Sequence, residues 1–298
     1  RPFSYLVPVN NFPYTVKVVD RTGKTIKEIT EVPLTDYIPT GFNATQREPR
    51  AHAWRADKPA TLVWAQAQDG GDPKTKAEVR DKLFAWDYPF TGKPQELISL
   101  PLRYWRIVWG NETTALVYER WTKDRKERVY LLNPTTGTSK VLFDLNYEDN
   151  YNYPGNPITA YNSFGRSTLL INPDNSIFLT GAGGSPEGDF PFLDKLNLTT
   201  GKKTRLWRCE APYYETVVTL LDPKKVTFVT SRESNSENPN YYLRTAGNNK
   251  LTPLTAFPHP YPQMKDVKKE LLKYKRADGV ELTAELYLPP GYKKEDGP

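Results

Sequence analysis

The stretch KERVYLLNPTTGTSKVLFD, residues Lys126–Asp144, has the pattern of a β-hairpin. Apolar side chains alternate with polar ones before and after the turn residues Thr136 and Gly137. This alternation on both sides of a glycine-containing turn is typical of two antiparallel strands, because glycine adopts positive φ without steric cost. We therefore expect two strands joined at Gly137.

The same turn pattern occurs five times along the chain. The turn glycines are Gly23, Gly92, Gly137, Gly201 and Gly247, and they are 69, 45, 64 and 46 residues apart. A base period near 45 residues with two enlarged units fits these spacings, because each long interval contains a polar loop, Gln66–Arg80 or Gly181–Phe190. Repeats of roughly 40–50 residues with four short strands each are typical of β-propeller blades.

Two further apolar runs precede each outer hairpin, which gives four strands per repeat. The runs next to the hairpins are Thr61–Ala67, Ala115–Glu119, Ile177–Thr180 and Val226–Thr230. The runs before those are AHAW, YWRIVW, ITAYNSF and ETVVTLL. We predict four full blades at about 50–104, 105–157, 158–213 and 214–262, after a partial blade in residues 1–34. Because propellers usually have more than four blades, the chain is expected to be the C-terminal part of a larger one.

Composition agrees with an all-β class. The 298 residues include 27 Pro and 18 Gly, 13% are aromatic, and no helix-length stretch has apolar positions at a period of 3.6. The net charge of +6 is mild and interspersed, and the single cysteine, Cys209, excludes an intrachain disulfide. No apolar stretch approaches the roughly 20 residues of a membrane span.

The blade pattern stops at the proline-rich stretch Phe257–Pro262, which cannot continue a strand ladder and is expected to be a stiff connector. A hairpin follows, with its turn at Asp278-Gly279 between strands through Leu271–Lys275 and Leu282–Leu288. It lacks the blade spacing. We therefore predict a β-propeller fragment in residues 1–262, and the connector with the first hairpin of a different, truncated domain in residues 263–298.

A catalytic nucleophile is not expected in this chain. The nearest approach to a G-x-S-x-G elbow is Gly183–Glu187, where glutamate replaces the last glycine and no strand-to-helix pattern surrounds Ser185. The only histidines are His52, on a predicted strand beside Trp54, and His259, between two prolines. Neither has a partner at a recognisable triad spacing.

Metal and nucleic-acid sites are not predicted either. Asp69–Asp72 and Glu148-Asp149 hold too few ligands to match a calcium or zinc motif, so we favour a solvated loop at each. The run Arg120–Arg128 has five cations, which could contact a phosphate backbone, but Asp124 and Glu127 interrupt it. We favour a solvated hairpin loop there, and we expect no cofactor.

The connector and the hairpin behind it, FPHPYP and then YKRADGVELTAELYLPPGY, resemble the junction between propeller and α/β-hydrolase domain in the prolyl oligopeptidase-type serine peptidases. More narrowly, several long stretches resemble the glutamyl endopeptidase-like branch, known from plant chloroplasts and bacteria. These stretches are RPFSYLVP, WRADKPATLVWAQAQDGGD, ALVYERW, SPEGDFPFLDKLNLTTGKK, YETVV and SRESNSENPNYYL.

This resemblance implies that the catalytic Ser-Asp-His triad belongs to a hydrolase domain beyond Pro298, so no catalytic residue is carried over to this chain. The propeller would cap the active site and control access of peptide substrates. The chain alone is expected to be inactive. The compartment stays open: chloroplast for a plant protein, cytoplasmic or exported for a bacterial one. The alternative is a standalone propeller that binds glycans or proteins.

The loop Gly181–Phe190 is our candidate for the substrate-gating element, with Ser185, Glu187 and Asp189 as its residues. Long loops in compact domains are more often functional than short ones. We expect this loop to face the hydrolase side and to contact the peptide's amino terminus or the cap interface. An ordinary solvent loop on the opposite face is the open alternative.

Overall fold

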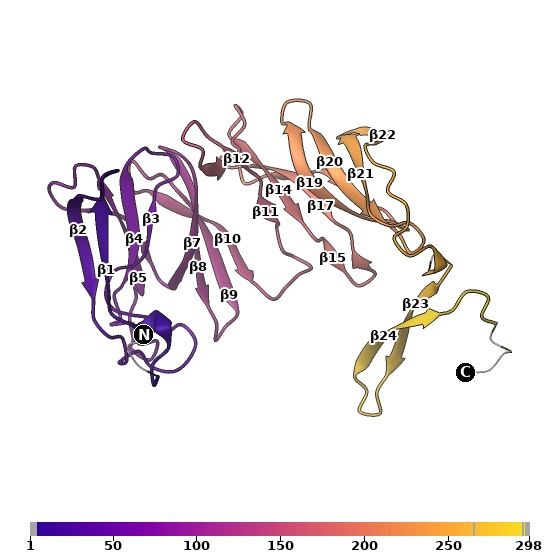
Figure 1. The fold of residues 1–298 in the computed structure, drawn as a ribbon, viewed down its shortest axis with the longest axis horizontal. Coiled ribbons are helices and arrows are strands. Elements are labelled where there is room, and N and C mark those ends of the chain that lie inside the picture. Colours follow the sequence, from indigo (N-terminus) through magenta and orange to yellow (C-terminus); the bar gives the residue numbers. More distant parts are fainter. Residues whose placement is uncertain (1–4, 265, 294, 296–298) are drawn as a thin grey trace. The chain divides into compact units, whose positions relative to one another are not determined.

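The computed structural model describes residues 5–264, 266–293 and 295, and these residues form strands and turns almost throughout (Figure 1). The helical elements among them are two short 3-10 turns, η1 (Val9–Asn11) and η2 (Pro262–Met264). The first residues of RPFSYLVP and the last residues of the terminal module lie outside the described ranges. No helix in the described ranges is long and apolar enough to cross a membrane. The predicted all-β class is confirmed.

Among the described residues, four antiparallel sheets have four strands each, in blade order. The first contains β3 (Arg50–Trp54), β4 (Thr61–Ala67), β5 (Asp81–Asp87) and β6 (Gln95–Leu100). The second contains β7 (Arg103–Asn111), β8 (Thr114–Trp121), β9 (Lys126–Leu132) and β10 (Ser139–Asn146). The third contains β11 (Asn156–Pro157), β14 (Ser176–Gly181), β17 (Phe192–Asn197) and β18 (Lys203–Arg208). The fourth contains β19 (Tyr214–Asp222), β20 (Thr227–Glu233), β21 (Asn240–Thr245) and β22 (Asn248–Pro253).

Four smaller sheets are two-stranded hairpins. The partial blade predicted near the start is the pair β1 (Tyr14–Val19) and β2 (Thr25–Val32). The others are β12 (Thr159–Tyr161) with β13 (Ser167–Leu169), β15 (Gly184–Ser185) with β16 (Gly188–Asp189), and β23 (Lys268–Lys275) with β24 (Glu281–Leu288).

The chain forms two compact units. One consists of the residues up to Asp149 together with Thr159–Ile171, and the other of Asn150–Ile158 together with the residues from Asn172 onward. The first unit holds β1–β2 and the first two full sheets, and the second holds the third and fourth full sheets and β23–β24.

Apolar packing between neighbouring sheets forms the core of the first unit. One cluster joins the first two full sheets through residues such as Leu83, Leu97 and Val117, and a second joins β1–β2 to the first full sheet around Trp64 and Phe90. A strand between two such interfaces is covered on both faces. This explains why β4 is a continuous apolar run with little alternation.

The five turn glycines all have positive φ, between 72° and 87°. At the β9–β10 turn, the Asn133 side-chain oxygen accepts hydrogen bonds from the amides of Thr135 and Thr136. Asn197 accepts the same pair of bonds at the β17–β18 turn, from Thr199 and Thr200. These side-chain bonds satisfy turn amides that the strand ladder leaves unpaired, and the predicted hairpins are confirmed.

Replacing Gly137 by valine is therefore expected to destabilise the protein by about 1–2 kcal/mol, because a β-branched residue is strained at φ 73°. Crowding adds little, since the nearest atom to a new Cβ, the Leu97 carbonyl oxygen, would lie 3.7 Å away. Chemical denaturation measures the loss. The control Gly137→Asn should lose less, because asparagine tolerates this conformation. Equal midpoints for Gly137→Val and the parent would contradict the strain at this turn.

One predicted inner strand is wrong. ITAYNSF, residues 158–164, does not continue the third full sheet beyond the amide of Ile158, which donates to the Phe178 carbonyl. The following residues form the separate β12–β13 hairpin, which packs on β7 in the first unit. A Cβ at Gly110 of β7 would lie 2.7 Å from a methyl carbon of Ile171, so glycine permits this close approach.

The prediction of a solvated loop is also wrong at Asp69. Its side chain is buried, and Arg103 donates to both its oxygens, at 3.1 and 2.8 Å. Arg80 adds a third bond at 2.8 Å. Burial by itself raises the pKa of the Asp69 carboxyl, but the bonds from the two guanidinium groups outweigh it and hold that pKa below its ordinary value. The Asp69 carboxylate is thus a buried, charged group that is paired with two arginines.

The same Arg103 guanidinium bonds the buried carboxylate of Asp81 at 2.9 Å and the carbonyl of Asn43 at 3.0 Å. These contacts link β5, β7 and two loops through one side chain. Nothing in the local sequence identifies the link, because its members are 22 to 60 residues apart.

Candidate functional site

The enlarged loops occupy the same position in their sheets. The loop that follows β4 and the loop that follows β14 both join the second strand of a sheet to the third. Because successive antiparallel strands alternate in direction, this loop lies at the end where the fourth strand finishes. In the fourth sheet, the connector to β23 leaves at that end. The enlarged loops are therefore at the connector end of their own sheets.

The candidate loop, Gly181–Phe190, folds into the small β15–β16 hairpin. Gly184 pairs with Asp189 and Ser185 with Gly188, and the Phe190 amide donates to the Gly183 carbonyl at 3.1 Å. A Cβ at Gly183 would lie 2.1 Å from the Phe190 carbonyl oxygen, so only glycine fits there. The loop has a defined shape held by its own backbone.

The Ser185 hydroxyl takes part in this turn. Its oxygen lies 2.8 Å from the Gly188 carbonyl and 3.0 Å from a carboxylate oxygen of Glu187, and it accepts from the Glu187 amide at 3.2 Å. Neither histidine lines the hollow beside it. The geometry around Ser185 is that of a turn and not that of an activated nucleophile.

A hollow of about 520 Å³ separates this loop from the β23–β24 hairpin within the second unit. Ser185, Pro186 and Glu187 line one side, and the other side is formed by hairpin residues that include Leu271 and Lys273. Glu187 carries a negative charge and Lys273 a positive one, and neither has an ion-pair partner among the described residues. Opposite charges thus face a shared space.

Asp189, the third residue of the predicted set, does not line this hollow. Its charge acts on Tyr214 of β19 instead. Burial raises the pKa of the Tyr214 hydroxyl, and the nearby Asp189 carboxylate raises it further. The loop therefore places Ser185 and Glu187 at the hollow, whereas the Asp189 carboxylate lies near Tyr214.

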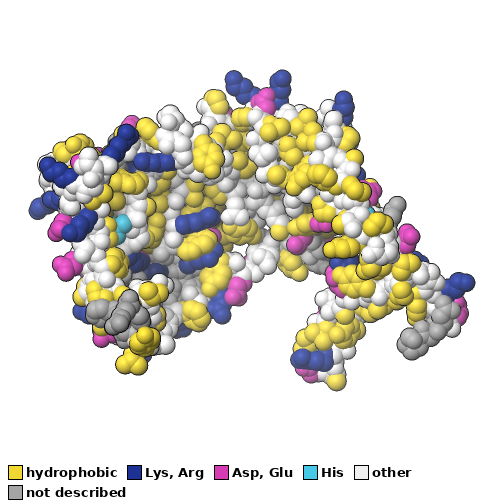
Figure 2. Space-filling view, in the orientation of Figure 1, with side chains coloured by type: hydrophobic (Ala, Val, Ile, Leu, Met, Phe, Trp, Pro, Cys, Tyr) yellow, Lys and Arg dark blue, Asp and Glu magenta, His cyan; other side chains and the backbone are white. Residues whose placement is uncertain are grey.

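The β23–β24 hairpin carries apolar side chains on an exposed surface (Figure 2). Leu271, Tyr274 and Tyr287 are each at least half exposed, at 57%, 50% and 58%. An isolated two-stranded hairpin is marginally stable, and this one leaves large apolar side chains exposed.

Each of the two histidines makes contacts that serve packing or turn geometry. His52 lies on β3, stacked on Trp64 with ring centroids 6.1 Å apart, and burial lowers the pKa of its imidazole. His259 accepts a hydrogen bond from the Tyr261 amide at 3.1 Å, which shapes the connector turn.

The basic run Arg120–Arg128 is largely neutralised by carboxylates. Arg120 pairs with Glu127 at 2.5 Å, Arg125 with Glu148 at 2.7 Å and Arg128 with Asp144 at 2.9 Å. The Arg120 guanidinium also lies 3.2 Å from the Trp105 ring centroid. These contacts join β8 and β9 to their neighbours.

Asn240, the first residue of β21, holds the connector against the fourth sheet. Its side-chain oxygen accepts from the Phe257 amide at 2.7 Å and from the Thr255 hydroxyl at 2.8 Å. Its side-chain nitrogen donates to the Phe257 carbonyl at 3.3 Å. Asn238 adds one bond to that carbonyl at 3.2 Å. The path of the chain toward β23 is thus fixed mainly by one amide side chain, which no sequence pattern had identified.

Asn240→Ala is expected to loosen the connector without unfolding the sheet, because three bonds to Thr255 and Phe257 are lost. At about 1 kcal/mol net per hydrogen bond, amide exchange at Phe257 should accelerate by tenfold or more. Hydrogen exchange read by mass spectrometry measures this, with Asn238→Ala, which removes one bond, as the milder control. Equal protection of Phe257 in the Asn240→Ala variant and the parent would contradict the assignment.

Two known proteins match this chain over its whole length. No family model matches the sequence. The chain is 40% identical over 316 residues to the probable glutamyl endopeptidase, chloroplastic, of Oryza sativa subsp. japonica, a match that covers 100% of this chain and 34% of that protein. It is 39% identical over 317 residues to the protein of the same name from Arabidopsis thaliana, covering 33% of it. The chain thus spans about a third of the curated relatives it matches.

The solved structures that match this chain are more distant from it in sequence. The Porphyromonas gingivalis dipeptidyl peptidase 4 is 15% identical, with a TM-score of 0.46, and the match covers 81% of this chain and 42% of that one. The Pyrococcus horikoshii acylaminoacyl peptidase is 14% identical, with a TM-score of 0.46, covering 95% of this chain and 37% of that one.

The curated matches confirm the resemblance predicted from the sequence. Along its whole length, this chain is similar to about a third of each of these two proteins named glutamyl endopeptidase.

Proposed function

We propose that this chain is the non-catalytic propeller portion of a serine peptidase and that it controls the access of peptides to the active site. The catalytic triad would belong to an α/β-hydrolase domain of which β23–β24 is the first hairpin. The observation that carries this proposal is the full-length match, at 40% identity, to a third of a protein named glutamyl endopeptidase. Peptides would be cleaved by that domain and not by this chain.

The geometry supports a gating role for the connector end of the sheets. The loop Gly181–Phe190 lies across a hollow from the β23–β24 hairpin, so a hydrolase domain built on that hairpin would start beside the loop. The exposed apolar side chains of the hairpin supply a surface on which such a domain would pack. A peptide that reaches the active site from this side would pass between the loop and the domain.

Two opposite charges would favour the closed form of this gate. Glu187 on the loop and Lys273 on β23 line the same hollow with opposite charges and no ion-pair partners of their own among the described residues. An exposed pair of this kind contributes up to about 1 kcal/mol, which is enough to bias an open–closed equilibrium severalfold. We therefore propose that their attraction favours the narrower opening and limits the size of accepted peptides.

A charge-reversal experiment in the full-length protein tests this role. Cleavage of glutamyl peptides of increasing length is measured as kcat/KM for Glu187→Lys, Lys273→Glu and the double reversal. Each single reversal should raise the ratio of long-peptide to short-peptide kcat/KM about two- to fivefold, because repulsion widens the opening. The double reversal should restore the parent ratio.

Glu285→Lys is the matched control, because Glu285 pairs with Lys269 on the same hairpin at 2.8 Å and does not line the hollow. Its length dependence should equal that of the parent. If both single reversals leave the length dependence unchanged while melting shows an intact fold, the loop does not gate access. If no variant cleaves any peptide, including the parent, the peptidase assignment itself fails.

A further inference from the structure

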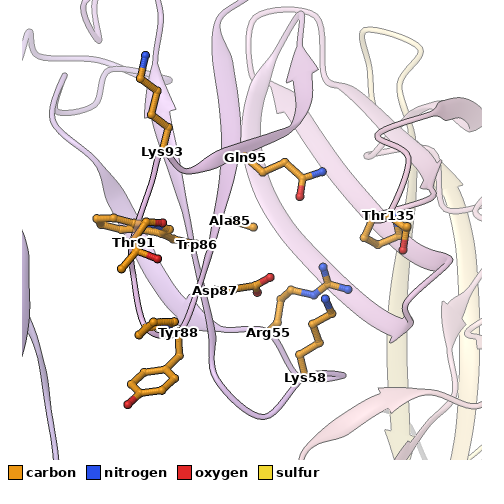
Figure 3. Close-up of a pocket in the computed structure, with 12 residues that line it drawn as sticks. Arg55, Lys58, Ala85, Trp86, Asp87, Tyr88, Thr91, Lys93, Gln95 and Thr135 are labelled. Carbon is orange, nitrogen blue, oxygen red and sulfur yellow. The ribbon is translucent and has the colours of Figure 1, made fainter.

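A second hollow, of about 370 Å³, lies in the first unit, and the proposed function makes no use of it (Figure 3). Its walls come from the β3–β4 turn, the end of β5 with the β5–β6 turn, and the β9–β10 turn at Pro134 and Thr135. In the first full sheet, these turns are at the end opposite the loop that follows β4. The hollow shares no lining residue with the candidate gate, which belongs to the second unit.

Arg55 is a buried cation at this hollow, and its side chain is fixed in position by Asp57. Its side chain is only 4% exposed, and it donates two bonds to Asp57, from Nε at 2.9 Å and Nη2 at 2.6 Å. The guanidinium lies 4.5 Å from the Trp109 ring centroid. The third nitrogen, Nη1, donates to no group among the described residues. Since Arg55 lines the hollow, a fixed donor remains for a ligand.

The turn that carries Arg55 is clamped from a distant part of the chain. Arg166, between β12 and β13, donates from Nη1 to the carbonyls of Arg55 and Lys58, at 2.8 and 2.7 Å, and from Nη2 to that of Pro59 at 3.2 Å. Asn162 adds a bond to the Ala56 carbonyl at 2.7 Å. Four bonds from the β12–β13 hairpin thus fix one short turn, which lowers the ordering cost of binding there.

Lys58 and Asp87 add opposite charges. Lys58 is half-buried, lines the hollow, and has no hydrogen-bond or ion-pair partner for its amine among the described residues. Asp87 accepts a bond from the Thr61 hydroxyl with one oxygen, which leaves the other available. In Figure 3 the Arg55, Lys58 and Asp87 side chains reach toward the same space, whereas Lys93 and Tyr88 extend away from it.

We propose that this hollow binds a small zwitterion, namely a free amino acid or a dipeptide. The carboxylate of the ligand would accept bonds from Arg55 Nη1 and Lys58 Nζ, and its ammonium group would donate to the free oxygen of Asp87. A simple anion would be repelled by Asp87, and a simple cation by Arg55 and Lys58. A ligand with both charges, a few ångströms apart, satisfies all three side chains.

Isothermal titration calorimetry with the full-length protein tests the proposal, with alanylalanine as the probe. Three comparison ligands are its C-terminal amide, its N-acetyl form and inorganic phosphate. Alanylalanine should bind with a Kd of about 1 mM, as expected of so small a ligand, and amidation or acetylation should each weaken binding about tenfold or more. Phosphate should bind more weakly than the dipeptide.

Variants locate the binding in this hollow and not at a peptidase active site. Lys58→Met should weaken alanylalanine about tenfold and reduce its preference over the amide, while Asp87→Asn should reduce the preference over the N-acetyl form. Lys93→Met is the matched control and should change the Kd by less than about twofold, because its amine extends away from the ligand. Lys58→Gln repeats the test if Lys58→Met fails to fold.

Three results would overturn the proposal. The first is no heat of binding at about 10 mM alanylalanine, well above the expected Kd. The second is equal affinity for the dipeptide and its amide. The third is a Lys58→Met effect on phosphate that exceeds its effect on the dipeptide, which would indicate a general anion site. Each of these outcomes leaves the peptidase assignment untouched, because that assignment is read from cleavage.

Discussion

Arg103 is buried between the carboxylates of Asp69 and Asp81, and the loops at one end of the first full sheet depend on it. A buried charge costs several kcal/mol unless it is paired, so removing this cation would leave the two buried carboxylates with only Arg80 and Arg50 as charged partners. In each of the other full sheets a buried carboxylate also pairs with an arginine, but both partners belong to the same sheet and the arginine is partly exposed. These pairs are Glu119 with Arg128, Asp194 with Arg205, and Glu215 with Arg244. Apolar contacts pack neighbouring sheets of the first unit against one another, and these ion pairs join strands within a sheet.

Local patterns were sufficient to predict the sheets but not the contacts between them. A hairpin is determined by neighbouring residues, so alternation around a glycine turn identified every outer strand pair correctly. The β12–β13 hairpin, within residues 159–171, has the same local pattern, and its first part was therefore predicted to be an inner strand. What distinguishes it is packing against β7 and the bonds from Arg166 to a turn more than a hundred residues away, and no local signal carries that information. Asp69 and Asn240 were misjudged or missed for the same reason.

The two ends of the sheets have different chemistry. At the connector end, the second-to-third strand loops carry the candidate gate and the Asn240 contacts that direct the chain toward β23. At the other end, the turns of the first unit form a charged hollow around Arg55. The buried Arg103 and the partly exposed Arg166 each tie one of these ends to a distant part of the chain, so guanidinium groups hold loops at both ends.

Local hydrogen exchange in an Arg103→Met variant of the full-length protein tests this account most directly, because methionine retains much of the side-chain volume and removes the charge. The Thr45 amide, which bonds the Gly71 carbonyl at 3.0 Å, and the amides of residues 68–80 should exchange about a hundredfold faster, as a loss of about 3 kcal/mol implies. Asp81→Asn in the same background should recover part of that protection, and the amides of β19–β22 should be unaffected. Unchanged exchange at Thr45 and in residues 68–80 would contradict the claim that the buried guanidinium holds these loops.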